Sequence, residues 1–337
     1  MTQGTVVNDN AGVYYSGRYW NDLPQVLAYM CENFTGDPRK WWVQDFRERY
    51  GGVPFDRMLV LNCGNGWVER ELIDRGLARQ AVAFDYAHDL LRQASDQRGS
   101  RPIAYFRADA NRVDFPDDSF DLVVNVAALH HVQYIHRLSR VLCRALRPDG
   151  VMVSFDYVGP GRNQYSWRHW RHIRRANRLL PVHLRKRPLV RHSLATMLAD
   201  DPTEAIHSDL ILPALACYFA LVERHDTGGG VAYEVLTHNS RIWEVPVDEL
   251  TPHVSRVLEM DRRLCARGDV PHMFSYFITR PLKARLDPSF VARTEREEER
   301  REARARALQG TYSYAEYGRA YLLPQLFRRL RGRPGRT

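Results

Sequence analysis

Residues 57–67 read Arg-Met-Leu-Val-Leu-Asn-Cys-Gly-Asn-Gly-Trp, and this stretch decides the fold. The apolar run 58–61 is typical of a short strand that is buried on both faces. Gly64 and Gly66 then allow the backbone to turn tightly and to approach a ligand closely, and a helical pattern begins at Trp67. A buried strand, a glycine turn and a helix in this order predict one unit of an α/β sheet, with a ligand at the turn.

The same pattern recurs along the chain after this stretch. Further strand patterns lie at 81–84, 103–106, 120–126, 151–155, 217–222 and 273–278. Helical patterns follow the strands at 58–61, 81–84 and 120–126, whereas a turn connects 103–106 with 120–126, and the regular alternation stops after Tyr157. Short apolar strands that alternate with helices predict an α/β fold of the Rossmann-like, doubly wound type, with a mostly parallel sheet of seven strands.

The composition is that of an ordinary globular protein. Of the 337 residues, 44% are hydrophobic and 26% are charged, and no apolar run approaches the roughly 20 residues that span a bilayer. The N-terminus has neither a basic start nor an apolar stretch, so we expect no signal peptide and a cytoplasmic protein. The five cysteines are scattered without a Cys-x-x-Cys pair, so we expect neither a disulfide framework nor a metal site.

The net charge of +9 comes from two arginine-rich segments. Residues 161–192 carry ten Arg or Lys and residues 318–337 carry six Arg, both without an acid, whereas the rest of the chain has 33 bases against 40 acids. Forked guanidinium groups suit the recognition of a carboxylate or a phosphate. The first segment is therefore a candidate for binding an anionic ligand, although a codon bias toward arginine explains it equally well.

Two carboxylates follow the next strands. Asp85 ends the second strand, 19 residues after Gly66, where its carboxylate can accept hydrogen bonds from both hydroxyls of an adenosine ribose. Asp109 ends the third strand, and the small Ala110 beside it leaves room for an adenine ring. Glu69 stands where a dinucleotide-binding turn has its third glycine, which disfavours a pyrophosphate ligand. These features at successive strand ends predict one adenosyl ligand.

With these residues the chain resembles a class I S-adenosylmethionine-dependent methyltransferase of the small-molecule type. The matching motifs occur in the family's order over about residues 57–157, and they are residues 60–66, 83–85, 108–110, 115–123, 129–131 and 142–150. The resemblance implies S-adenosylmethionine as the cofactor and methyl transfer as the reaction.

The resemblance also implies which residues surround the cofactor. The glycine turn faces the methionine part, Asp85 holds the ribose, Asp109 and Ala110 hold the adenine, and Asn125 holds the amino end. The full set is Asn62, Cys63, Gly64, Gly66, Asp85, Tyr86, Asp109, Ala110 and Asn125.

Two positions depart from the family pattern. The family usually has an acidic residue where Asn62 stands, and often a third glycine where Val68 stands. Asn62 can form hydrogen bonds but brings no negative charge to the cofactor's ammonium group. We therefore expect cofactor binding to persist, either weakened or compensated elsewhere.

The resemblance divides the chain into five segments. We expect a helical N-terminal cap at 1–54, a Rossmann-like half that binds S-adenosylmethionine at 55–158, an inserted basic and helical substrate lid at 159–208, completion of the sheet at 209–283, and a charged helix with a basic tail at 284–337.

Candidate catalytic residues follow the fourth and fifth strands. Methyl transfer from a sulfonium is an in-line displacement that depends mainly on positioning, and an oxygen or nitrogen acceptor also needs a base. His130 and His131 follow the fourth strand, beside the expected methyl group, and neutral imidazole suits this task. The sequence does not distinguish between them. Tyr157 is a third candidate, and it can equally be a wall of the site.

Candidate acceptor-binding residues lie near the lid and the N-terminus. Residues 159–165 are expected to form the hinge of the lid, and N-terminal aromatic residues can close the site from the other side, although core packing explains them as well. The candidates are Tyr14, Tyr19, Trp20, Asp156, Arg162 and Tyr165.

The leading interpretation is methyl transfer to an oxygen or nitrogen, or a carbon, of a small molecule such as a secondary metabolite or sugar derivative. An RNA methyltransferase is an alternative, favoured by arginines with interleaved aromatic residues, but no RNA-binding module or Asn-Pro-Pro motif supports nucleic acid as a partner. A further alternative is a protein of this fold that binds the cofactor and catalyses another reaction. The tail 318–337 mixes leucine with arginine and predicts a weak membrane contact.

Overall fold

The computed structural model describes residues 18–297 and residue 300. Its centre is one sheet of seven strands in the order β3-β2-β1-β4-β5-β7-β6. The strands are β1 (Phe55–Leu61), β2 (Ala78–Asp85), β3 (Ile103–Arg107), β4 (Phe120–Val126), β5 (Leu146–Tyr157), β6 (Phe219–Asp226) and β7 (Phe274–Pro281). Only β7 runs antiparallel to its neighbours, β5 and β6, among these strands. The predicted Rossmann-like, mostly parallel sheet of seven strands is therefore confirmed.

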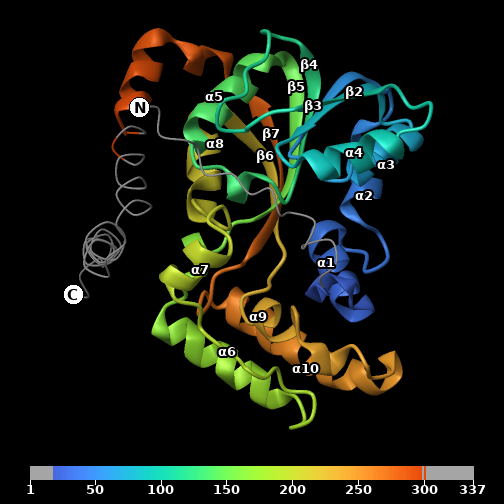
Figure 1. The fold of residues 1–337 in the computed structure, drawn as a ribbon, viewed down its shortest axis with the longest axis vertical. Helices are drawn as coiled ribbons and strands as arrows, with labels where there is room; N and C mark the ends of the chain where they lie inside the picture. The colour runs from blue at the N-terminus through green and yellow to red at the C-terminus, as the bar shows by residue number, and fades with distance from the viewer. Residues whose placement is uncertain (1–17, 298–299, 301–337) are drawn as a thin grey trace.

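Helices cover both faces of the sheet (Figure 1). They are α1 (Pro24–Thr35), α2 (Trp42–Tyr50), α3 (Trp67–Asp74), α4 (His88–Asp96), α5 (Ile135–Ala145), α6 (Trp167–Leu179), α7 (Leu194–Asp200), α8 (Ile211–Tyr218), α9 (Ala232–Leu236) and α10 (Val247–Ala266). Side chains of α5 and α8 contribute to the core on one face, and those of α1, α2 and α3 contribute to the core on the other.

The burial of β1 between two layers of helices explains why residues 58–61 are all apolar. Met58 and Val60 point into one core, whereas Leu59 and Leu61 point into the other. Successive side chains of a strand point to opposite faces, so a strand covered on both sides needs an apolar residue at every position. Each such side chain contributes roughly 1.5–3 kcal/mol when it is fully buried.

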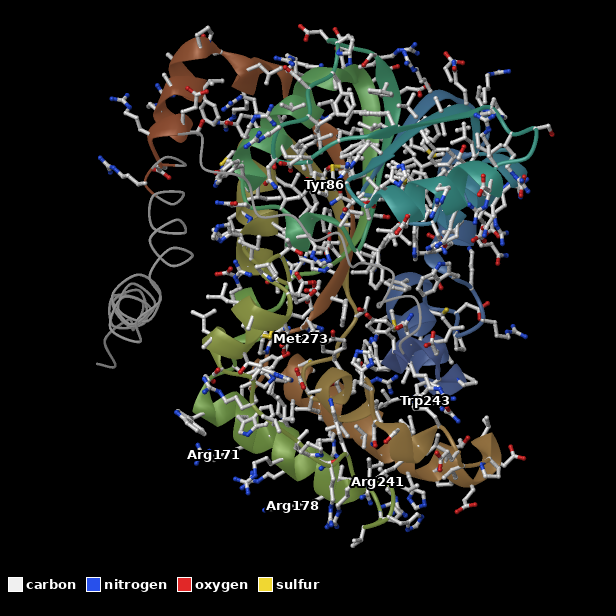
Figure 2. The ribbon with its side chains drawn as sticks, viewed as in Figure 1. Tyr86, Arg171, Arg178, Arg241, Trp243 and Met273 are labelled. Carbon is white, nitrogen blue, oxygen red and sulfur yellow. The ribbon has the colours of Figure 1, made fainter. Side chains whose placement is uncertain are left out.

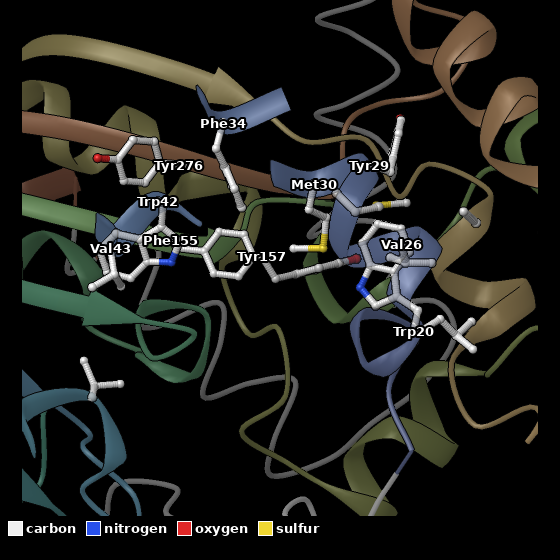
Figure 3. Packing of buried hydrophobic residues seen from close by; sticks show 14 of the residues in the cluster. Trp20, Val26, Tyr29, Met30, Phe34, Trp42, Val43, Phe155, Tyr157 and Tyr276 are labelled. Atoms are coloured by element: carbon white, nitrogen blue, oxygen red, sulfur yellow. The ribbon is translucent and has the colours of Figure 1, made fainter. Parts of the chain in front are cut away.

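The helices α6, α9 and α10 lie together at one end of the molecule, beyond the end of the sheet (Figure 1). The core that contains α1 and α2 continues into these helices. Figure 3 shows aromatic residues of this core, including Trp20, Phe34, Phe155 and Tyr157. The Phe34 and Phe155 rings meet edge to face with centroids 5.3 Å apart, so the N-terminal helices and the sheet share one packed interior.

Some of the segments for which we made predictions lie outside the described residues. They include residues 1–17 of the N-terminal cap and the basic tail 318–337, for which we predicted a membrane contact. Among the described residues, no helix is both long enough and apolar enough to cross a membrane.

Candidate active site

Hydrogen bonds join the carboxyl ends of β1, β2 and β3. The Cys63 amide donates to the Phe84 carbonyl at 2.9 Å, and the Ala108 amide donates to the Asp85 carbonyl at 3.0 Å. The Asp85 carboxylate accepts the Gly64 amide at Oδ2 and the Ala87 amide at Oδ1, each at 2.8 Å. The glycine turn and the first predicted carboxylate therefore lie in direct contact.

The turn after β1 requires glycine at Gly66. Its φ of +79° lies in the left-handed region, and a Cβ there would come within 2.6 Å of the Tyr105 hydroxyl and 2.8 Å of the Ala94 Cβ. Asn62 also has a positive φ, of 40°, which is a conformation that asparagine tolerates better than most residues. Its side-chain amide donates to the Ala128 carbonyl at 3.5 Å, so the β1 turn contacts the loop after β4.

The residues at these strand ends fit an adenosyl ligand. Each Asp85 oxygen accepts one backbone amide, and a carboxylate oxygen can accept a second hydrogen bond, so acceptor sites remain for two ribose hydroxyls. Burial raises the pKa of Asp85, and the backbone amides lower it. Ala110 is buried, and Asp109 accepts the Asn111 amide at 2.8 Å. The half-buried Tyr86, labelled in Figure 2, lies under the Arg107 guanidinium at 4.5 Å.

A buried carboxyl group lies in the helix that follows the glycine turn. Glu69 of α3 is fully buried, and the Tyr105 hydroxyl and the Glu69 backbone amide offset this burial only in part. Burial is the main cause that raises the pKa of Glu69 to about 7. In the sequence, Glu69 stands out only as the residue that replaces a glycine.

A buried network occupies the ends of β4 and β5. Asp156 is completely buried and accepts hydrogen bonds from the Asn125 side chain at 2.7 Å, the Leu129 amide at 2.8 Å and the Ala128 amide at 3.2 Å. Its other oxygen lies 2.6 Å from His130 Nδ1. Asp156 thus fixes the orientation of the His130 ring.

Asn125 is part of the same network. Its amide also donates to Ser154 at 2.7 Å, its oxygen accepts the Leu129 amide at 3.1 Å, and its side chain is completely buried. These contacts differ from the expectation that Asn125 holds the amino end of the cofactor. They differ in the same way for Asp156, which was expected to contact the acceptor. Both residues support the loop that carries the histidines.

A second hydrogen-bond relay orients His131. Its Nδ1 lies 3.1 Å from the Thr203 hydroxyl, 72 residues along the chain, and this hydroxyl donates to Asp201 at 2.7 Å. The next residue, Glu204, places Oε2 at 3.8 Å from His130 Nε2 and 3.9 Å from His131 Nε2. The two predicted histidines therefore meet a carboxylate of the predicted lid segment.

The two histidines differ in their tendency to hold a proton. Burial acts to lower the pKa of His130, but the negative charges of Asp156 and Glu204 outweigh it and raise this pKa to about 9. Burial lowers the pKa of His131, and the adjacent charge of His130 lowers it further. The cluster His130–His131–Glu204 thus favours one protonated imidazole, that of His130, beside a neutral His131.

Aromatic side chains lie beside this cluster. The Tyr157 ring centroid is 6.1 Å from that of His130 and 6.1 Å from that of Tyr233, and Tyr157 is itself buried. Burial raises the pKa of Tyr157 well above its usual range. A phenol that resists ionisation is a poor general base, so this placement favours Tyr157 as a wall of the site.

The other aromatic candidates for acceptor binding pack against ring side chains of their own. Trp20 is buried and stacks on Phe274, with centroids 5.5 Å apart, whereas the Tyr19 ring lies 4.9 Å from that of His238. Tyr165 is also buried, and its ring stacks on Trp170 at 6.3 Å. Tyr14 lies outside the described residues.

The predicted lid segment packs against the loop that carries His130 and His131. The Ile206 amide donates to the His130 carbonyl at 3.0 Å. Arg162 is buried, its guanidinium donates to the Pro202 carbonyl, and its backbone amide donates to the Ala205 carbonyl at 2.6 Å. Arg162 thus connects the start of the lid to its end, rather than presenting a charge to an acceptor.

The arginines of α6 face outward. The buried face of this helix consists of His169, Trp170, Ile173, Ala176 and Asn177. Arg171 and Arg178 are exposed, and Figure 2 shows them at the outer surface of the molecule. The helix that we expected to face an anionic acceptor therefore turns its positive charge to the solvent.

Asp201, Thr203 and Glu204 were not predicted as site residues. They lie in the predicted lid segment, between α7 and η5 (Ser208–Leu210), and belong to none of the cofactor motifs. Nothing local in the sequence connects them with His130 and His131.

Comparison with known proteins identifies the domain. The family described as "Methyltransferase domain" matches residues 59–154. An uncharacterised chloroplastic methyltransferase of Arabidopsis thaliana is 32% identical over 140 residues, which cover 39% of each chain. A 27-O-demethylrifamycin SV methyltransferase of Amycolatopsis mediterranei is 29% identical over 110 residues, which cover 31% of this chain and 39% of that protein.

The likeness is concentrated in the half of the sheet that carries the glycine turn. A ubiquinone/menaquinone biosynthesis C-methyltransferase of Ectopseudomonas mendocina is 26% identical over 137 residues, 39% of this chain and 54% of that protein. The chain thus spans about two fifths to three fifths of the length of the curated relatives that it matches. A solved S-adenosylmethionine-dependent methyltransferase of Mesorhizobium loti is 22% identical, with a TM-score of 0.46, over 71% of this chain and 96% of that one. Residues 59–154 thus match a methyltransferase domain, and the motifs and the sheet order agree with the class I S-adenosylmethionine-dependent methyltransferases that the sequence resembles.

Proposed function

We propose that this protein transfers the methyl group of S-adenosylmethionine to an oxygen or nitrogen atom of a small molecule, which binds over His130, His131 and Glu204. The observation that carries this proposal is that the Glu204 carboxylate lies beside His130 and His131. The loop that holds these two histidines also contacts the turn after β1. An oxygen or nitrogen acceptor must lose a proton when it is methylated, and a cluster of imidazoles and a carboxylate is where that proton can leave.

The protein's own residues have distinct parts in this reaction. When bound, S-adenosylmethionine supplies a methyl group on a positively charged sulfur. Asp85 holds the ribose, and the Gly64–Gly66 turn allows the backbone to lie close to the methionine part. Asp156 and the Thr203–Asp201 relay keep the two imidazole rings in place, so that the acceptor atom is positioned in line with the methyl group.

A small-molecule acceptor is supported by the lid. Glu204 and Ile206 contact His130, and Tyr157 packs beside His130 and against Tyr233 and Phe274, so the surroundings of the cluster come from parts of the chain outside the matched domain. One relative is named 27-O-demethylrifamycin SV methyltransferase, and we extend this class of acceptor, a small molecule methylated on oxygen, to the present chain. The outward arginines of α6 give no support to an anionic acceptor at the cluster.

Replacing Asp85 tests the cofactor site. In Asp85→Ala the ribose loses its acceptor, so the affinity for S-adenosylhomocysteine should fall at least about tenfold, which corresponds to about 1.4 kcal/mol. Isothermal titration calorimetry measures this affinity directly.

Asp89→Ala is the matched control, because Asp89 is an exposed carboxylate on the adjoining helix α4. It should bind S-adenosylhomocysteine as the wild-type protein does. Unchanged affinity in folded Asp85→Ala protein would remove Asp85 from the site.

A panel of acceptors tests the reaction. The protein should form S-adenosylhomocysteine when it is given S-adenosylmethionine together with a suitable hydroxyl or amine compound, and mass spectrometry should find the compound heavier by one methyl group. Tight cofactor binding without methyl transfer to any member of a broad panel would instead favour a different reaction on the same fold.

A further inference from the structure

The cluster of His130, His131 and Glu204 has the donor set of a metal site. One ligand atom from each residue lies within 4.8 Å of the other two. The two distances from Nε2 to Glu204 Oε2, 3.8 and 3.9 Å, are too long for direct hydrogen bonds. Two ligands on one ion at about 2.1 Å lie roughly 3–3.5 Å apart, so small side-chain rotations would bring all three atoms onto one centre.

The hydrogen bonds at Nδ1 decide which nitrogen can bind an ion. The Asp156 carboxylate is an acceptor, so His130 donates to it from Nδ1. The Thr203 hydroxyl gives its single hydrogen to Asp201, so its oxygen accepts from His131 Nδ1. With Nδ1 engaged in both rings, Nε2 is the nitrogen left to bind an ion, which displaces the proton that His130 holds there, and both Nε2 atoms are the ones closer to Glu204.

These partners have the form of the outer contacts in known metal sites. Metal-binding histidines almost always donate their second ring nitrogen to a carboxylate or another oxygen, which fixes the tautomer and the ring orientation. Here one histidine has a carboxylate directly, and the other reaches one through a hydroxyl. Two imidazoles and one carboxylate with remaining open positions are a ligand set that Zn²⁺ and related ions use in catalytic sites.

We infer that His130, His131 and Glu204 bind one divalent transition-metal ion of the Zn²⁺ type, which holds the acceptor oxygen; this last step rests on the proposed function. This inference departs from the expectation, drawn from the cysteine pattern, that the chain has no metal site. The sequence hid the site because its third ligand comes from the lid segment.

The ion would take part in the reaction as a Lewis acid. It stabilises the anionic form of a coordinated acceptor hydroxyl, whose proton passes to water. The oxygen then uses a lone pair to form the bond to the methyl carbon while the carbon–sulfur bond breaks. The electron pair of that bond stays on sulfur, which changes from a sulfonium to a neutral thioether, so charge and atoms balance.

Titration with Co²⁺ tests the metal site independently of activity. Full-length protein without a polyhistidine tag, freed of metal with a chelator, should take up one equivalent of Co²⁺ with visible d–d absorption, and Zn²⁺ should displace it. Glu204→Gln and His131→Ala should each lower the Co²⁺ affinity at least about tenfold, because each removes a ligand. Circular dichroism verifies that the variants are folded.

Thr203→Val tests the outer contact with a nearly isosteric change. It removes the oxygen that accepts from His131 Nδ1 but no ligand, so the Co²⁺ affinity should fall about tenfold. His183→Ala is the control, because His183 is an exposed histidine of the same segment, and it should bind Co²⁺ normally.

Absence of saturable Co²⁺ uptake, or uptake that persists unchanged in Glu204→Gln and His131→Ala, would overturn the inference. Calorimetry with S-adenosylhomocysteine and methyl-transfer assays on the same metal-free protein separate this result from failure of the proposed function. Methyl transfer that proceeds without metal would leave the methyltransferase proposal intact and reject the ion.

Discussion

At the scale of single residues, Asp156 is the group on which the site depends most. It accepts hydrogen bonds from His130, from Asn125 and from the backbone of the loop that carries both histidines. The positive charge that His130 attracts and these hydrogen bonds lower the pKa of Asp156, although its burial acts in the opposite direction. The carboxylate is therefore ionised in a place where water cannot reach it.

Asp156→Asn should destabilise the protein by about 3 kcal/mol, because breaking a buried ion pair leaves its partner without compensation. The new amide would also direct hydrogens toward the Leu129 amide, which is itself a donor. Urea unfolding monitored by circular dichroism measures the loss. Asp89→Asn, at an exposed carboxylate, should change the stability little, and equal stability of the two variants would contradict the role given to Asp156.

At the scale of elements, the turn before α3 belongs to the predicted cofactor site, whereas α3 itself carries a carboxyl group, that of Glu69, whose burial is unfavourable when it is ionised. The turn needs glycine because the Tyr105 hydroxyl and Ala94 pack directly beneath Gly66. In the first turn of α3, the Glu69 carboxyl group is buried, and its burial outweighs the effect of the Tyr105 hydroxyl beside it. Such a group prefers to be neutral, so this helix is expected to respond to pH.

Glu69 should make the stability fall as the pH rises. Its pKa is about 7 in the folded protein and 4.5 ordinarily, so the folded state binds the proton more tightly. The contribution of Glu69 is most favourable below the ordinary pKa. It is lost progressively as the pH rises through the folded pKa, with a total loss of about 3 kcal/mol.

Glu69→Gln removes this titration and should flatten the stability profile between about pH 5 and pH 8. At the upper end of this range the variant should be more stable than the wild type in urea unfolding. Glu71→Gln, two residues further along α3, should keep the wild-type slope. If the slope survives in Glu69→Gln, another group is responsible for it.

At the scale of the whole molecule, the sheet and the end helices are one folding unit. The core that begins at β1 continues through α1 and α2 to α6, α9 and α10. Asp261 of α10 strengthens this connection, because it accepts the amides of Val231 and Ala232 at the start of α9 and the hydroxyl of Tyr29 in α1. Stabilising one end of the molecule should therefore stabilise the other.

S-Adenosylhomocysteine should raise the temperature of a single unfolding transition. At about 100 times its Kd the ligand adds about 2.7 kcal/mol to the stability of the folded state, which moves Tm by several degrees in a chain of this size. Differential scanning calorimetry measures the shift, and Asp85→Ala should lose most of it. Two transitions, of which only one moves with the ligand, would contradict a single folding unit.

The sequence by itself determined the sheet and the ligand class. Apolar runs such as 58–61 are local signals, and each ends in a turn whose residues, Gly64, Gly66 and Asp85 among them, are adjacent in the chain to the strand they follow. Because parallel strands end at a common edge, the order of these signals was sufficient to bring the turn and the first carboxylate together.

Only the tertiary structure decided what surrounds the histidines and where the charges point. Glu204 and the relay from Thr203 to Asp201 reach His130 and His131 through packing of a segment some 70 residues away, and no motif in the sequence connects the two segments. The same packing buried Asp156 and Asn125 behind the loop and turned the arginines of α6 outward. Local patterns describe which residues can be buried, whereas the direction of a side chain depends on which distant surface covers it.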